Sequence, residues 1–156
     1  MRRLVAIVIG LAIIGTACGG ATRDESGAIV EEGSVGLFSV KVGDCINLPV
    51  DGEELFSFDA VACDQPHNAQ AFEVFNVVGF GEEFPGEDPI LEQADETCLD
   101  EFSSFVGIAY ADSRYYYTPV FPTAESWEQD DREVICFLIP EVATDTIDQD
   151  LRGAAA

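Results

Sequence analysis

Basic residues are scarce in this 156-residue chain: 7 Lys and Arg stand against 30 Asp and Glu, giving a formal net charge of −23. Affinity for nucleic acids depends largely on counterion release by Lys and Arg, so this deficit excludes a nucleic-acid-binding protein. Apolar residues are not scarce, since 47% of the chain is hydrophobic and 10% is aromatic. We therefore expect one hydrophobic core and not a disordered chain.

The amino terminus lacks an apolar run long enough to cross a bilayer, but it carries the features of an export signal. Two arginines precede an apolar segment over residues 4–14, and small residues then lead to Cys18. This arrangement resembles the lipobox of bacterial lipoproteins, and it predicts a signal peptide over residues 1–17 and a diacyl anchor, including palmitate, on Cys18. Ordinary secretion after cleavage near Ala17 stays open as the alternative.

The anchor predicts a location on the outer, extracytoplasmic face of the cell membrane, held through the lipid on Cys18. Residues 18–34 are expected to form a lipid-anchored polar linker. Loss of residues 1–17 removes two arginines and no acidic residue, so the mature chain would carry 5 basic and 30 acidic side chains. Anionic lipid repels such a charge, so the lipid and not electrostatic attraction would hold the protein at the membrane.

The cysteine count is odd, but lipidation of Cys18 would leave an even set of four: Cys45, Cys63, Cys98 and Cys136. An exported chain meets an oxidising compartment, which favours two disulfides. Three pairings are possible, and we favour Cys45 with Cys63 and Cys98 with Cys136. The alternative is a zinc site from Cys63 and His67, completed by Cys45 or Cys136, but no Cys-x-x-Cys pair exists. We therefore predict no metal.

Signatures of catalysis are also lacking. His67 is the only histidine, and no Gly-x-Ser-x-Gly motif accompanies it. The abundant carboxylates show no spacing that singles out a glycosidase pair. We favour a structural role for His67 in the turn after Cys63, and we predict no catalytic residue and no cofactor. An envelope hydrolase or glycan-modifying enzyme that uses His67 or a carboxylate pair stays open as the alternative.

Alternating apolar residues and β-branched or aromatic runs predict strands over residues 35–46, 56–63, 71–80, 115–121 and 133–139. The first of these is interrupted by a turn or bulge at Gly43-Asp44. Pro119 indicates an edge strand, because proline cannot donate to a ladder. The segment over residues 133–139 is apolar on both faces, which is typical of a central strand.

One long helix is predicted to begin at Asp88-Pro89 and to end before Gly107. Its apolar stripe recurs at steps of three and four residues: Leu91, Ala94, Cys98, Phe102 and Phe105. Cys98 therefore points at the sheet, and a disulfide with Cys136 follows if the helix packs on that face. Thr123 is expected to cap a helical turn over residues 123–129.

These elements predict an α+β fold over residues 35–140, with a small antiparallel sheet, one long amphipathic helix packed on it, and two disulfides as staples. Residues 141–156 have little apolar content, so we expect a loosely ordered acidic tail.

Several short segments around the cysteines form a distinctive combination: Val42-Gly43-Asp44-Cys45, Val61-Ala62-Cys63, Pro66-His67, Phe105-Val106-Gly107, Pro122-Thr123-Ala124-Glu125-Ser126-Trp127 and Val134-Ile135-Cys136-Phe137-Leu138. Together they resemble the septum formation domain of actinobacterial envelope proteins. The resemblance implies an extracytoplasmic, often membrane-tethered domain that acts in the cell envelope or in division, with no established catalytic residue. The family usually has Gly-Asp-Arg after the tryptophan segment, whereas this chain has Asp130-Asp131-Arg132.

Exposed aromatic side chains are the best candidates for binding, because Tyr and Trp rings stack on sugars and anchor interfaces. Along a strand, Tyr115 and Tyr117 share one face and Tyr116 takes the other. The candidate binding residues are His67, Tyr116 and Trp127. We expect a non-enzymatic lipoprotein module that binds an envelope protein or glycan in cell envelope or septum formation.

Overall fold

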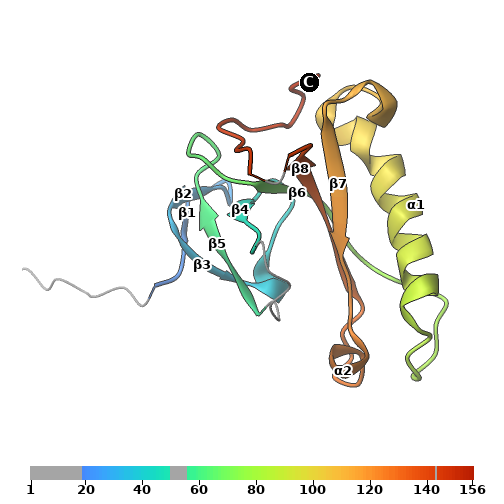
Figure 1. The fold of residues 1–156 in the computed structure, drawn as a ribbon. Coiled ribbons are helices and arrows are strands. Elements are labelled where there is room, and N and C mark those ends of the chain that lie inside the picture. The colour runs from blue at the N-terminus through green and yellow to red at the C-terminus, as the bar shows by residue number, and fades with distance from the viewer. Residues whose placement is uncertain (1–18, 50–55, 143) are drawn as a thin grey trace, which may run out of the picture.

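The computed structural model describes residues 19–49, 56–142 and 144–156, so the predicted signal peptide and lipidation at Cys18 lie outside the described residues. Six strands form an antiparallel sheet in the order β3-β5-β4-β6-β8-β7 (Figure 1). They are β3 (Gly33–Gly36), β4 (Cys45–Asn47), β5 (Ser57–Val61), β6 (Ala69–Asn76), β7 (Tyr115–Val120) and β8 (Glu133–Pro140). The α+β class is confirmed, but the sheet is larger than the small one that we predicted.

The extra strand arises because residues 35–46 do not form one continuous strand. β3 and β4 lie on opposite sides of β5, with Val35 opposite Phe58 and Ile46 opposite Ala60. A 3-10 turn, η1 (Leu37–Ser39), begins the crossing. Gly43 ends it with a φ of 101°, which residues with a side chain rarely adopt. The predicted turn at Gly43 is therefore present, and it separates two strands.

The predicted helix is α1 (Glu87–Val106), which packs on β6, β7 and β8 (Figure 1). Its N-cap is Gly86 and not Asp88, so it begins two residues earlier than predicted, and it ends as predicted at Gly107, which is left-handed with a φ of 91°. The buried side begins with Ile90, and not with Leu91 as predicted, and continues through Ala94, Cys98, Phe102 and Phe105. The three- and four-residue spacing identified the correct face over most of the helix.

β8 is an interior strand, as its sequence predicts. Val134, Cys136 and Leu138 pack on the side that α1 covers, whereas Ile135 and Phe137 pack into a second core on the opposite side. β7 lies at the edge of the sheet, which agrees with the prediction from its proline.

Both predicted disulfides form. Cys45 bonds Cys63 with a Cα–Cα distance of 5.3 Å, and Cys98 bonds Cys136 with a Cα–Cα distance of 5.7 Å. On the loop-closure model these bonds destabilise the unfolded chain by about 3 and about 4 kcal/mol, because they close loops of 18 and 38 residues. The sulfur atoms of the proposed zinc site are therefore used in disulfides, and the described residues contain no cluster suited to a metal ion.

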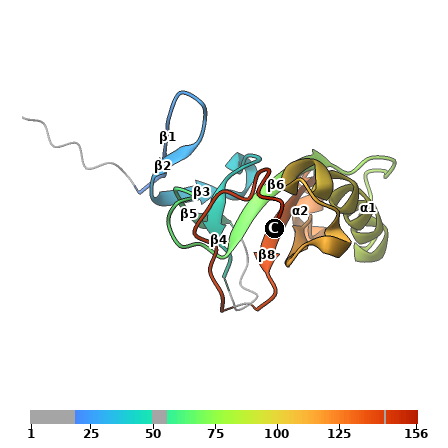
Figure 2. The same cartoon turned by 90° about the horizontal axis from the view of Figure 1, so that it is seen from above.

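The segment expected to be a polar linker, residues 18–34, is folded from residue 19 onward. Strands β1 (Thr22–Arg23) and β2 (Ile29–Glu31) form a hairpin beyond the β3 end of the sheet (Figure 2). Ile29 is only 7% exposed in the core, and the Gly19 carbonyl accepts a hydrogen bond from Ser34 N at 2.8 Å. One buried apolar residue and backbone pairing are enough to join this polar segment to the domain.

The tail over residues 141–156 also differs from the expected loose segment. Ile147 forms an antiparallel bridge with His67, with N···O distances of 2.7 and 2.9 Å. Leu151 is fully buried, and Ala155 N donates to the carbonyl of Val106 at the end of α1. Two apolar side chains in an otherwise polar segment are too few for a periodic signal, although they suffice to pack the tail.

A short helix, α2 (Ala124–Trp127), follows β7, and Thr123 caps it as predicted. Thr123 Oγ1 accepts from Ser126 N at 3.1 Å, and Ser126 Oγ accepts from Thr123 N at 3.0 Å. In the part of the chain that the structure describes, no helix has the length and apolar character needed to span a membrane.

Candidate binding site

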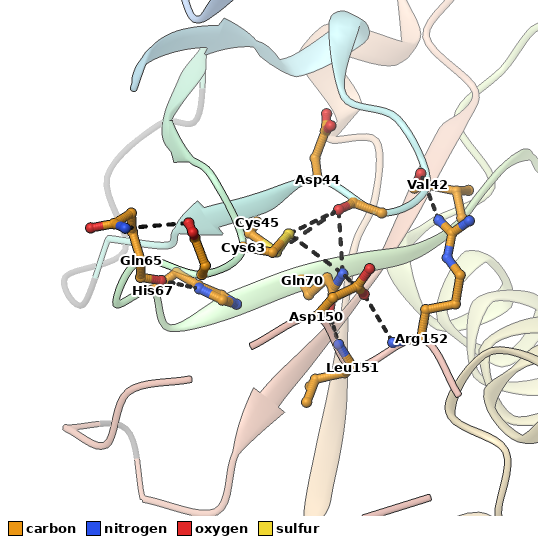
Figure 3. Close-up of a disulfide and its surroundings, with 12 residues drawn as sticks. Val42, Asp44, Cys45, Cys63, Gln65, His67, Gln70, Asp150, Leu151 and Arg152 are labelled. Carbon is orange, nitrogen blue, oxygen red and sulfur yellow. Dashed lines mark hydrogen bonds between the residues drawn. A yellow bond between two sulfur atoms is a disulfide. The ribbon is translucent and has the colours of Figure 1, made fainter. Parts of the chain in front are cut away.

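His67 is fully buried beside the Cys45–Cys63 disulfide (Figure 3). Its Nδ1 lies 2.7 Å from the carbonyl oxygen of Gln65, so Nδ1 carries the proton and donates, because a carbonyl can only accept. Burial lowers the pKa of His67, opposed by the Gln65 hydrogen bond and by Asp148 and Asp150. The imidazole therefore holds the turn after Cys63 in its neutral form, in agreement with the structural role that we favoured.

The polar groups around this disulfide bond one another. Gln70 Nε2 donates to Asp150 Oδ1 at 2.7 Å, and Gln70 Oε1 accepts from Leu151 N at 2.8 Å (Figure 3). Gln70 is fully buried. These bonds hold the tail on β6.

Trp127, the second candidate, is a core residue. Its side chain is 1% exposed, and its Nε1 donates to the carbonyl of Glu82 at 3.0 Å. Phe80 and Phe84 contact the ring edge to face. The short helix α2 turns this ring inward, which its sequence alone did not indicate.

Tyr116, the third candidate, is 45% exposed, while Tyr115 and Tyr117 pack on the α1 side of β7 as predicted from the strand alternation. Its ring packs edge to face with Tyr110, with the ring centroids 6.4 Å apart. The structure thus places His67, Trp127 and Tyr116 in three separate places and does not bring them together into one site.

A groove of about 800 Å³ lies between η1 and α2, on the side of the sheet away from α1. Its apolar wall is formed by side chains from three segments, namely Leu37, Phe38, Phe56, Val120 and Phe121. Phe38 is 65% exposed and Phe56 is 78% exposed, so the residues that the structure describes leave both rings largely uncovered. The volume is typical of ligand-binding clefts.

The groove is also lined by polar residues from α2, from the turn after it and from the first position of β8. The acidic groups here are Glu125, Asp130, Asp131 and Glu133. Asp131 Oδ1 accepts from Glu133 N at 3.0 Å, which places the two carboxyl groups close together. Burial, and then the nearby charge of Asp131, raise the pKa of Glu133. The Oε1 atom of Glu133 is buried and has no hydrogen-bond partner.

Arg132 also lines the groove, but it makes no salt bridge to the groove acids. Arg132 lies with its guanidinium 3.5 Å from the centre of the Trp127 ring, and Nη1 donates to the carbonyls of Trp127 and Asp131. Within residues 19–49, 56–142 and 144–156 the only salt bridge is Arg23–Asp44, and none of the groove acids takes part in it. The groove therefore combines apolar side chains with four acidic residues and one arginine.

No sequence pattern directly indicates this groove. Phe38 and Phe56 belong to segments that we predicted as strand, where alternation assigns one side of each strand to the core. The available clue was Asp130-Asp131-Arg132, which departs from the usual Gly-Asp-Arg of the family. Asp130 has a φ of 63°, a left-handed conformation that favours glycine.

The chain was compared with known proteins. A protein-family model described as septum formation matches residues 39–156, which include both disulfides, α1, the tail and most of the groove. No curated protein and no solved structure is significantly similar to the chain. Because the family model covers well over half of the sequence, the chain belongs to the septum formation family.

Proposed function

We propose that this protein is an extracytoplasmic, membrane-anchored lipoprotein domain that binds another envelope component, without catalysis, in septum formation. Family membership suggests a role in cell division or the cell envelope. The observation that carries the proposal is the groove, which combines exposed Phe38 and Phe56 with carboxylates that lack a cationic partner. Unpartnered apolar and charged surfaces of this kind are typical of binding sites.

Export and lipidation are supported by the motif around Cys18 and by the two disulfides, because disulfides persist in oxidising compartments. Intact-mass spectrometry of the protein extracted in detergent tests this part. We expect the mature chain to begin at Cys18 with acyl chains attached, and Cys18→Ala to release the protein from membranes. A soluble wild-type chain that begins at Cys18 without lipid would contradict the anchor.

A binding role is favoured because the only histidine is buried and hydrogen-bonded within its own turn. One observation favours the alternative of a glycan hydrolase: Glu133 has a raised pKa beside a second carboxyl group, Asp131, in a groove, and such pairs serve as general acid and base. Turnover assays on isolated envelope glycans discriminate the two functions. Turnover that Glu133→Gln abolishes would establish the hydrolase.

The division role is tested by the position of an export-competent fluorescent fusion in dividing cells. We expect enrichment at midcell, with Cys18→Ala separating membrane attachment from positioning. A matched pair of variants, Phe56→Ser in the groove and Leu99→Ser on α1, asks whether the groove determines that position, since both remove an exposed apolar side chain. Loss of midcell signal in both variants, or in neither, would contradict a specific role of the groove.

A further inference from the structure

We propose that the groove between η1 and α2 binds a positively charged segment of a partner protein, in which a Lys or Arg side chain lies next to a large apolar side chain. This inference rests on the proposed function, because it takes the groove as the binding surface and specifies the chemistry of its occupant. Two independent features of the groove support it: exposed apolar side chains, and four acidic residues that outnumber the one lining arginine and form no salt bridge with it.

The apolar wall requires an apolar occupant. Phe38 and Phe56 come from different segments, yet they line one continuous surface together with Leu37, Val120 and Phe121. Isolated exposed apolar residues are common on proteins, but a contiguous patch of this kind marks an interaction site. The rings are phenylalanines without a polar group of their own, so this wall offers no hydrogen bond to the hydroxyl groups of a sugar. An apolar side chain is the matching partner.

The acidic wall requires a cation with hydrogen-bond donors. Glu133 Oε1 is buried without a donor, which is a costly state for a carboxyl group. Glu125, Asp130 and Asp131 line the same groove, and no salt bridge to them occurs in the described part of the chain. An ammonium or guanidinium group would supply donors to Glu133 and would reduce the repulsion among the four acids.

The overall charge disfavours anionic occupants. Anionic lipid, phosphate and acidic glycans are repelled by a chain with a formal charge of −23, whereas a basic protein segment is attracted over a long distance. A small cation alone would leave the phenylalanine wall uncovered. The two walls face one groove, so one short segment with alternating basic and apolar side chains can contact both.

Binding of a designed peptide to the full chain, purified in a neutral detergent, tests the proposal by fluorescence polarisation. The probe is a fluorescein-labelled peptide Ala-Phe-Lys-Leu-Arg-Phe-Ala, and its matched control replaces Lys and Arg with glutamine and citrulline. We expect the basic peptide to bind and the neutral peptide to bind roughly ten- to a hundredfold more weakly, because hydrogen bonds to charged groups are lost. Anionic vesicles and a neutral envelope oligosaccharide serve as the competing probes.

Variants localise the binding. Glu133→Gln and Phe56→Ser are expected to weaken the basic peptide roughly tenfold or more. Glu96→Gln on the exposed side of α1 is the matched control for charge, and it should leave the affinity within about twofold. Both groove variants are expected to fold, because Glu133 Oε1 has no partner to lose and Phe56 is largely exposed. Urea midpoints check that expectation.

The inference is overturned if the basic and neutral peptides bind equally, if Glu96→Gln weakens binding as much as Glu133→Gln, or if the vesicles or the oligosaccharide bind in place of the peptide. The basic peptide could fail to bind while Phe56→Ser still loses midcell enrichment and Leu99→Ser keeps it. That result would overturn only this inference. The groove would then still serve the proposed function with an occupant of another chemistry. Failure of both measurements would overturn the proposed function as well.

Discussion

The ion pair between Arg23 and Asp44 is expected to make the amino-terminal hairpin an integral part of the fold. Both guanidinium nitrogens of Arg23 bond the two carboxylate oxygens of Asp44, at 2.5 and 2.6 Å. The Asp44 side chain is 3% exposed and the Arg23 side chain 19% exposed. Asp44 Oδ2 also accepts from Lys41 N at 2.8 Å. Replacing Arg23 with methionine would leave a buried carboxylate with one backbone donor.

The size of the effect follows from this geometry. Removing one partner of a fully buried ion pair costs about 3–5 kcal/mol. Arg23 is partly exposed and the Lys41 N–H stays in place, so we expect Arg23→Met to reduce the free energy of unfolding by about 2–3 kcal/mol. With a urea m-value of about 2 kcal/mol per molar, the midpoint falls by roughly 1 M or slightly more.

Fluorescence of Trp127, which is 1% exposed and is the only tryptophan, reports the unfolding transition in urea with both disulfides intact. Lys41→Met is the matched control, because it removes one positive charge at an exposed side chain and keeps the backbone donor. A double-mutant cycle with Asp44→Asn isolates the pair, with an expected coupling of about 1.5–3 kcal/mol. Equal midpoints for Arg23→Met and Lys41→Met would refute the argument and would restore the linker interpretation of this segment.

Three further predictions concern single residues. Asp130→Gly should raise the free energy of unfolding by about 0.5–1 kcal/mol, because glycine adopts a φ of 63° without strain, and an unchanged urea midpoint would contradict this explanation. The free energy of unfolding should fall as the pH drops below about 6.5, because the imidazole of the unfolded chain binds a proton that buried His67 does not. The His67→Phe variant should therefore lose less stability than the wild type between about pH 7.5 and about pH 5.5. Equal losses for the two proteins in urea unfolding would contradict this explanation. Leu151→Ala should cost about 2–5 kcal/mol in urea unfolding, whereas a loose tail would show no change.

Local patterns predicted the elements that depend on local chemistry. The three- and four-residue spacing predicted the buried face of α1. The run of apolar residues predicted that β8 is an interior strand. Thr123 was recognised as a helix cap because its side chain bonds a residue only three positions away. The disulfide pairing was correct because Cys98 and Cys136 each lie on an apolar face that the other element covers.

Features that depend on distant partners were missed. Arg23 meets Asp44 across 21 residues, and Gln70 meets Leu151 across 81 residues, so neither the hairpin nor the tail has a local pattern that reveals its packing. The groove has the same origin, since Phe38, Phe56 and Glu133 come from three separate segments. Side-chain alternation along a strand indicates a buried face, but it does not show which segments fail to cover it.

Hydrogen bonding that begins at Gly19 bears on how far the domain can reach from a membrane. A flexible linker of about 16 residues would give the domain a leash with a root-mean-square length of roughly 20–24 Å. A lipid on Cys18 would instead lie one residue before Gly19, whose carbonyl is already paired in the fold. The domain would then rest against the bilayer with a restricted set of orientations, and a partner would have to approach within a domain's width of the lipid surface to be bound.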